Sequence, residues 1–381
     1  MEKDTLLEVT SYEVLGELPD IFTFDNGEKL TDPKDWPRRR SEIYKTAVEL
    51  QYGTIPPAPE FLDVEILYVG KNCNSYKITT GRRDCPVSFR MQLFHPDTKE
   101  KCPVIVDGDM CFPYFTHTDF VNTALDKNIC WAFFDRTELA HDIRNEGRRQ
   151  GQLYRTYPEY TFGALGAWAW GFSRCVDALL KLDIIDETKI VFTGHSRGGK
   201  TAMLAGVLDT RAAIVCPNDT NAGSCSCYRI HMSGLNEKGV DKRSETLADL
   251  WRNFGYWIGE GMGEYTEREN ELPFDCHFLK AMVAPRTLFI SEAVHDLWGN
   301  PIGSWQTTKA AEELFEFLGA KDQLYWYFRD GAHLHSIGDV EMLVNLIEHK
   351  FRGVPLSENF FRRPFEEREL IFKQRVKNEG S

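Results

Sequence analysis

One serine in this sequence has a setting that indicates chemistry, because it lies between two glycines where two contrasting runs meet. Ser196 is part of KIVFTGHSRGGKTAMLAG (residues 189–206), with an apolar, β-branched run before GHSRG and an Ala- and Leu-rich run after it. A G-x-S-x-G pentapeptide between a strand and a helix places its serine on a sharp turn with the hydroxyl exposed. Ser196 is therefore predicted to be a nucleophile. The alternative is an ordinary helix N-cap serine.

A serine nucleophile needs two partners from elsewhere in the chain. A histidine must take the hydroxyl proton, and a carboxylate must orient that histidine and stabilise its charged form. In α/β-hydrolases these residues follow in the order serine, acid, histidine. Asp296 comes soon after the apolar run RTLFIS and His333 comes soon after LYWYF, so the order is complete. His335, two residues further on, is the alternative base.

The elements that must position these residues are short apolar strands that alternate with helices. Continuous apolar strands separated by helices such as GAWAWGFSRCVDALLKL (166–182) indicate a parallel sheet covered on both faces. Before them, VEILYV, SYKITT and VSFRMQLFHP alternate in polarity as an antiparallel region does. We expect an α/β-hydrolase fold over residues 61–381, with residues 1–60 as an N-terminal extension packed on it. The apolar strands are predicted at residues 103–108, 129–134, 189–194, 212–217, 286–291 and 324–328.

Composition and charge argue against several classes of protein. A formal net charge of -13 is unsuited to nucleic acid, whose phosphates require clustered Lys and Arg. No apolar run reaches the length of about 18 residues that a membrane span needs, and MEKDTLLEVTSYE lacks the order of a signal peptide. Neither a nucleic-acid nor a membrane partner is expected, and the expected location is cytoplasmic, although a trimmed sequence could hide a signal.

The ten cysteines are too sparse for a disulfide scaffold and are expected to be mostly small buried hydrophobic residues. Some of them gather with a histidine, but their spacings do not match the paired C-x2-C pattern of zinc ligands. No metal and no other cofactor is therefore expected. The residues of this group are Cys216, Cys225, Cys227 and His231.

A family resemblance rests on the serine segment and on motifs spread over most of the chain. The run GHSRGGKTAMLAG followed by PNDTNAGSCSCYRI resembles the carbohydrate esterase group that includes glucuronoyl esterases, as do WPRRRSEI, YGTIP, LPFDCHFLKAMVAPRTLF, DLWGNP and RDGAHLHSIGD. The resemblance implies a serine carbohydrate esterase that hydrolyses a sugar ester of plant cell-wall oligosaccharides. A glucuronoyl ester is the first expectation. An acetyl-xylan or acetyl-oligosaccharide esterase is the alternative, and a peptidase of the same fold is a further one.

The resemblance also implies roles for residues around the serine. Arg197 would stabilise the oxyanion, with a surface ion pair as its alternative role. The second backbone donor to the oxyanion is expected near Asp109 and Met110. The residues that would line the sugar-binding pocket are Lys200, Trp298, Glu245 and His195.

Two acids compete for one role, because members of this group differ in where the catalytic carboxylate lies. Asp219, in PNDTNAG, has the earlier position and Asp296 has the later one, which agrees with the general α/β-hydrolase order and is preferred. Secreted fungal members carry a cysteine just before the nucleophile, bonded to one in the later loop. Here His195 takes the first position and Cys227 the second, so that disulfide cannot form.

Overall fold

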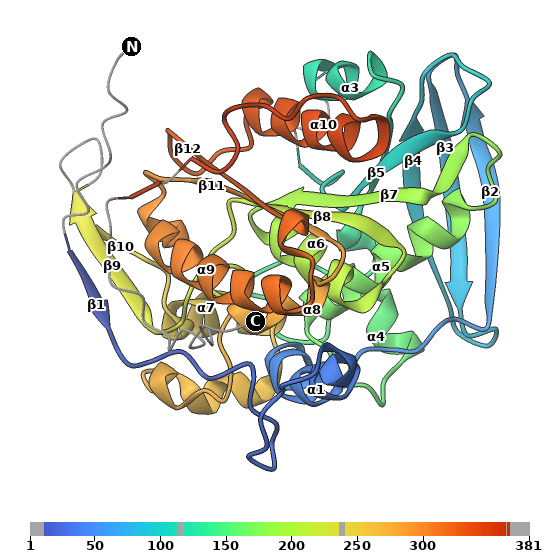
Figure 1. Ribbon diagram of the computed structural model, residues 1–381. Helices are drawn as coiled ribbons and strands as arrows, with labels where there is room; N and C mark the ends of the chain where they lie inside the picture. The colour runs from blue at the N-terminus through green and yellow to red at the C-terminus, as the bar shows by residue number, and fades with distance from the viewer. Residues whose placement is uncertain (1–10, 113–117, 236–240, 363, 366–381) are drawn as a thin grey trace.

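A nine-stranded sheet forms the centre of the computed structural model, which describes residues 11–112, 118–235, 241–362 and 364–365 (Figure 1). Its strand order is β12-β11-β8-β7-β5-β6-β4-β3-β2. The strands from β12 to β6 pair in parallel, whereas β4, β3 and β2 pair antiparallel. The bounds are β2 Phe61–Val69, β3 Cys73–Gly81, β4 Pro86–Phe94, β5 Cys102–Asp107, β6 Cys130–Phe134, β7 Ile185–His195, β8 Ala212–Asn218, β11 Thr287–Ala293 and β12 Leu324–Arg329.

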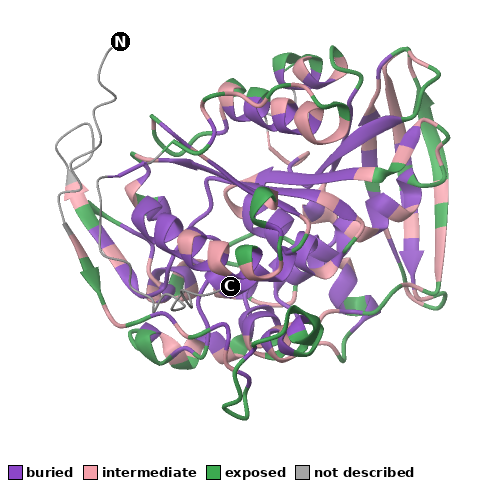
Figure 2. Ribbon diagram, viewed as in Figure 1, coloured by how far each residue is buried: buried purple, intermediate pink, exposed green. Residues whose placement is uncertain are grey.

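Helices cover both faces of this sheet, which explains why the buried centres of its parallel strands are mostly apolar. On β5, Ile105 packs with α3 and α10 on one face, and Val104 and Val106 belong to the larger core on the other. Figure 1 shows α3 and α10 on one side of the sheet and α5, α6, α8 and α9 on the other, and Figure 2 shows the strands between them as buried. The α/β-hydrolase prediction is confirmed. The helix bounds are α3 Thr118–Leu125, α4 Gln152–Thr156, α5 Ala164–Leu179, α6 Arg197–Leu208, α7 Leu247–Phe254, α8 His277–Val283, α9 Pro301–Phe317 and α10 Ile337–Arg352.

The N-terminal segment packs against this core through both apolar and polar contacts. Its helical run comprises α1 (Trp36–Ile43), a π-helical turn (Tyr44–Glu49) and α2 (Leu50–Tyr52), and it ends at Gly53. Arg40 donates to the carbonyls of Met282 (3.1 Å) and Val207 (2.7 Å). The domain boundary at residue 60 stays a prediction.

A second, three-stranded antiparallel sheet joins the N-terminal segment to the middle of the chain. Its strands are β1 (Ser11–Val14), β9 (Ile230–Leu235) and β10 (Asp241–Arg243), in the order β1-β9-β10. This sheet was not predicted from the sequence. None of the described helices combines the length and the apolar character that crossing a membrane requires.

Candidate active site

Ser196 occupies a strained turn between a buried strand and a helix. β7 ends at His195 and α6 begins at Arg197. The backbone of Ser196 has φ 56° and ψ −118°, which non-glycine residues rarely adopt and which local hydrogen bonds must maintain. Its N–H donates to the carbonyl of Asn218 (2.9 Å), and its own carbonyl accepts from Lys200 N–H (2.9 Å). Within the described part of the chain its side chain makes no capping hydrogen bond to α6, so the N-cap interpretation fails.

The second glycine of the pentapeptide leaves room for a buried carboxylate. A methyl group on Gly198 would overlap the side chain of Asp109, which comes from the loop after β5. That carboxylate accepts the backbone N–H of His195 (2.9 Å) and pairs with the buried guanidinium of Arg136. The turn that presents Ser196 is thereby fixed to the neighbouring strand.

His333 and Asp296 meet at the same edge of the sheet as Ser196. They follow the neighbouring parallel strands β12 and β11, and His333 Nδ1 donates to Asp296 Oδ2 at 2.7 Å. The His333 side chain is 34% exposed and Asp296 is buried. The ring of His195, next to the serine, lies 4.7 Å from the His333 ring between centroids. Because Nδ1 carries the donated proton, Nε2 is the nitrogen that remains to accept one in the neutral imidazole.

The electrostatics of His333 result from two opposed effects. Burial lowers its pKa, but the hydrogen bond and negative charge of Asp296 outweigh burial and raise the pKa above the ordinary value. A carboxylate stabilises the protonated imidazole in this way. His333 therefore has the two properties that a general base requires, a free Nε2 position and a stabilised cationic form.

Of the two other histidines of this cluster, His335 is buried and His195 is half-buried, and both favour the neutral form. His335 stacks on His195 (centroids 5.6 Å apart) and contacts the edge of Phe120 on α3. Burial lowers the pKa of His335, and burial together with the neighbouring histidines lowers that of His195 well below its usual range. His195 Nδ1 lies 2.8 Å from Asn218 Oδ1. The structure thus brings His333, rather than the alternative His335, to Asp296.

Asp219 reaches the backbone of the histidine loop and not the imidazole. Its Oδ2 accepts the N–H of Leu334 (3.2 Å), and its Oδ1 accepts the N–H of Ala293 (2.6 Å). Burial raises its pKa, even though the guanidinium of Arg329 lies 2.5 Å away. Asp339 also pairs with Arg329 (2.9 Å), so one buried cation faces two carboxylates.

Arg329, which was not predicted from the sequence as a site residue, holds the loop that carries His333. Its Nη1 and Nη2 donate to three loop carbonyls, those of Asp330, Ala332 and Leu334. The signal that could have revealed it is a charged residue at the end of the apolar strand LYWYF, directly before the loop. Asn218, which contacts both Ser196 and His195, was also not predicted, and no motif in the sequence indicates its position in the site.

Arg197 lies in an aromatic setting and pairs with a carboxylate. Its guanidinium donates to Asp142 Oδ2 (3.0 Å) and stands over the ring of Trp257, 4.8 Å from the centroid. Asp142 also accepts from Tyr256 Oη (2.8 Å) and Trp257 Nε1 (2.9 Å). Although burial opposes it, the charges of Arg197 and Arg136 lower the pKa of Asp142. Arg197 therefore forms the ion pair expected as its alternative role, and its side chain remains 29% exposed beside Ser196.

The predicted backbone donors to the oxyanion are already used within the protein. Asp109 N–H donates to Asp107 Oδ1 (2.8 Å), and Met110 N–H donates to the carbonyl of Phe134 (3.3 Å). In this structure each of the two N–H groups therefore has an acceptor in its own loop or in the adjacent strand, and the position of the second donor near these residues stays a prediction.

Three of the predicted sugar contacts are linked to one another by an ion pair and a backbone hydrogen bond. Lys200 and Glu245 form a buried ion pair (3.3 Å), and Lys200 also donates to the carbonyl of Ala222. Burial lowers the pKa of Lys200 and raises that of Glu245. The backbone N–H of Glu245 donates to the carbonyl of Trp298 (3.1 Å), whose side chain is 38% exposed. A backbone hydrogen bond thus joins the buried charge pair to the turn that carries the exposed indole, two residues after Asp296.

The cysteines that the sequence analysis considered as zinc ligands are buried thiols. Cys227 Sγ contacts Asp275 Oδ2 at 3.5 Å. No group of three or more potential metal ligands occurs in the described ranges.

Comparisons with known proteins agree in pointing to one family. The family model described as glucuronyl esterase, fungi, matches residues 78–319. A 4-O-methyl-glucuronoyl methylesterase of Podospora anserina is 30% identical over 328 residues, covering 84% of this chain and 64% of that protein. One from Schizophyllum commune is 27% identical over 367 residues, covering 94% and 88%. The chain spans 64% and 66% of the length of the first two such relatives, from Podospora anserina and Hypocrea jecorina.

Solved structures extend the likeness to nearly the whole fold. A carbohydrate esterase family 15 glucuronoyl esterase from Caldicellulosiruptor kristjansonii has a TM-score of 0.80 and 29% identity, with 96% of both chains covered. The catalytic domain of a Hypocrea jecorina glucuronoyl esterase has a TM-score of 0.75 and 25% identity, covering 94% of this chain and 96% of that one.

Proposed function

Because the chain belongs to the glucuronyl esterase family, we propose that it is a serine esterase that hydrolyses a glucuronoyl ester of plant cell-wall oligosaccharides. The observation that carries the proposal is the hydrogen bond between His333 and Asp296 beside the strained turn of Ser196. The curated relatives are named for ester hydrolysis at a 4-O-methyl-glucuronoyl group.

The proposed reaction proceeds through an acyl-enzyme. Ser196 Oγ gives its proton to His333 Nε2 and forms a bond to the carbonyl carbon of the uronoyl ester. The tetrahedral intermediate collapses, and the leaving alkoxide takes that proton from the imidazolium. A water molecule then gives a proton to His333 and attacks the acyl carbon. When this second tetrahedral intermediate collapses, the bond to Ser196 Oγ breaks, Oγ takes the proton back from the imidazolium, and the uronic acid is released. Asp296 stays ionised and holds the imidazole throughout.

Arg197 is proposed to stabilise the negative charge that develops on the carbonyl oxygen. It follows the nucleophile directly and keeps part of its guanidinium exposed while Asp142 holds it. A preorganised cation at a developing oxyanion contributes on the order of 3 kcal/mol to transition-state stabilisation. Asp142 would then act as a positioning residue for Arg197.

The sugar is proposed to bind against Trp298, with the Lys200–Glu245 pair behind it. An exposed indole offers a flat apolar face to the C–H groups of a pyranose ring. The buried pair supplies one donor and one acceptor for hydroxyl groups at the base of the site. Because breaking a buried ion pair costs about 3–5 kcal/mol, Lys200→Ala would confound binding with stability. Trp298 is the cleaner position for a test.

A substrate panel tests the proposal and its alternatives. We expect hydrolysis of the methyl ester of glucuronic acid and of p-nitrophenyl acetate, with little hydrolysis of acetylated xylan or an aminoacyl anilide. Trp298→Ala should raise KM for the glucuronate ester by about fivefold, through loss of roughly 1 kcal/mol of stacking, and leave the aryl acetate unchanged. Acetylated xylan as the preferred substrate would overturn the glucuronoyl assignment. An equal loss on both small esters would make Trp298 structural.

The pH dependence of hydrolysis should reflect the base. His333 must be neutral to accept the serine proton, so kcat/KM rises with pH through its pKa. Since Asp296 raises that pKa, the midpoint of the acidic limb should lie above the ordinary histidine value of about 6.5. Rates of aryl acetate hydrolysis over about pH 5 to 8 measure it. A midpoint below the ordinary value would contradict His333 as the base.

A further inference from the structure

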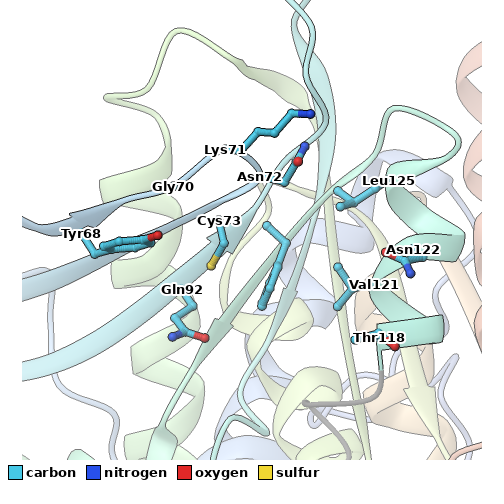
Figure 3. A pocket seen from close by; sticks show the side chains of 11 residues that line it. Tyr68, Gly70, Lys71, Asn72, Cys73, Gln92, Thr118, Val121, Asn122 and Leu125 are labelled. Atoms are coloured by element: carbon cyan, nitrogen blue, oxygen red, sulfur yellow. The ribbon is translucent and has the colours of Figure 1, made fainter.

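A cavity of about 450 Å³ lies away from the residues of the candidate active site, between the sheet and α3 (Figure 3). One wall consists of side chains near the ends of β2, β3 and β4, and the other is α3. Its size is within the range of about 300–1,000 Å³ that is usual for small-molecule sites. The residues that line it are Tyr68, Gly70, Lys71, Asn72, Cys73, Gln92, Phe94, Thr118, Val121, Asn122 and Leu125.

The two walls of the cavity arise from the regular spacing of side chains along a helix and along a strand. On α3 the lining residues Thr118, Val121, Asn122 and Leu125 follow the i, i+3, i+4, i+7 spacing of one helix face. On β4, Gln92 and Phe94 are two residues apart and so face the same side of the sheet. Phe120, which lies between these positions on α3, contacts His335 instead. α3 therefore separates the cavity from the histidine cluster.

An aromatic ring forms the outer wall. Tyr68 lies on the edge strand β2, just after an irregularity in register between Ile66 and Tyr68, and it is 60% exposed. Its ring folds over Gly70, where a Cβ would come within 2.8 Å of the ring. The glycine thus permits the ring to lie across the hairpin turn.

The polar groups in the cavity are mainly neutral amides. Gln92 and Asn122 make no side-chain hydrogen bond among the residues that the structure describes, so both amides remain available. Asn72 donates to the carbonyl of His95 (3.1 Å), which fixes the orientation of its side chain. Lys71 is the single charged side chain among the described lining residues. This set suits neither a phosphate, which needs several cations, nor a metal ion, which needs carboxylates.

We propose that this cavity is a second carbohydrate-binding site, which takes a sugar ring of a polysaccharide chain. A pyranose presents an apolar face of C–H groups and a rim of hydroxyls, which matches one exposed aromatic ring beside two free amides. The identity of the chain as a plant cell-wall polysaccharide rests on the proposed function. Binding at two places on one chain raises the effective concentration of the ester at the catalytic site. The cavity therefore favours long substrates over short ones.

Binding of linear xylohexaose, which contains no ester, tests the cavity independently of catalysis. In isothermal titration calorimetry, the double variant Tyr68→Ala/Asn122→Ala should bind xylohexaose about tenfold more weakly than the parent protein. The control is Ile66→Ala, an equally exposed apolar residue on β2 that does not line the cavity. It should bind like the parent. Undiminished binding by the double variant would overturn the proposal, as would an equal loss in Ile66→Ala.

Kinetics then separate failure of this site from failure of the proposed function. The double variant should keep the parent kcat and KM on the methyl ester of glucuronic acid but show a KM about tenfold higher on esterified glucuronoxylan. No hydrolysis of either ester by the parent protein would refute the proposed function, while the xylohexaose titration would still report on the cavity. An unchanged KM on the polymer would overturn the second site alone.

Discussion

Ser196→Ala should abolish ester hydrolysis and leave the protein folded. Removing the nucleophile of a serine hydrolase typically costs on the order of a millionfold in kcat. The fold should survive because the hydroxyl caps no helix, and the backbone bonds that hold the turn come from the Ser196 N–H and carbonyl. An alanine in the same strained conformation keeps both bonds. kcat on the methyl ester of glucuronic acid and the midpoint of urea unfolding measure the two parts of this prediction.

Ser88→Ala on β4 is the matched control for Ser196→Ala. Ser88 is also partly buried, and its hydroxyl bonds to Thr79 (2.9 Å) far from the proposed triad. It should keep full activity. If Ser196→Ala retained more than about a hundredth of the parent kcat, Ser196 would not be the nucleophile. If the variant failed to unfold cooperatively, its lost activity would say nothing about chemistry, and a Ser196→Cys variant with altered reactivity toward thiol reagents would locate the nucleophile instead.

The sequence predicted the large sheet because its physical signal is local. Parallel strands buried on both faces must be apolar along their whole length, and the runs at 103–108 and 286–291 meet that condition. The serine turn was predictable for the same reason, since strand, pentapeptide and helix are contiguous. The loops of Asp296 and His333 then followed from the chain order of the fold.

The three-stranded sheet was not predictable because its signal is not local. β1 has four residues and pairs with a strand more than 200 residues later in the chain. β10 has only three residues, and strands this short hold too few residues for a recognisable period-two pattern, although Ile230 and Met232 on β9 are buried. The same limit applies to Met110 in the loop after β5, whose N–H donates to the carbonyl of Phe134 on β6, a strand that only the folded chain brings near.

The burial of the charged residues around the site could not be predicted from the sequence, for a different reason. Lys200 falls in a helix with a mixed composition, where a lysine is usually solvated. Its burial depends on Glu245, which α7 and the Trp298 turn bring to it from 45 residues away. Arg329 similarly acquires its role only when β8, β12 and α10 place Asp219 and Asp339 on either side of it. Pairing of this kind is a property of tertiary structure.

Asp296→Asn should lower kcat by on the order of 10⁴, and Asp219→Asn should cost much less. An asparagine at 296 removes the negative charge that stabilises the His333 imidazolium, and its amide can impose the wrong tautomer on the ring. Asp219 makes no hydrogen bond to the His333 ring among the described residues and acts through Leu334 N–H and Arg329. Its loss should shift the loop slightly, which typically costs up to about 100-fold.

The pH profile distinguishes a catalytic carboxylate from a positioning one. Asp296→Asn should move the acidic limb of kcat/KM to lower pH, because the partner that raises the pKa of His333 is gone. Asp219→Asn, whose charge is a smaller influence on that pKa, should shift the limb less while lowering kcat. Asp330→Asn, on the same loop but 91% exposed and paired with His295, is the control and should leave both the acidic limb and kcat unchanged.

A larger loss of kcat and a larger pH shift in Asp219→Asn than in Asp296→Asn would transfer the catalytic role to the earlier carboxylate. That result would require the loop to move, since Asp219 now binds its backbone rather than its imidazole.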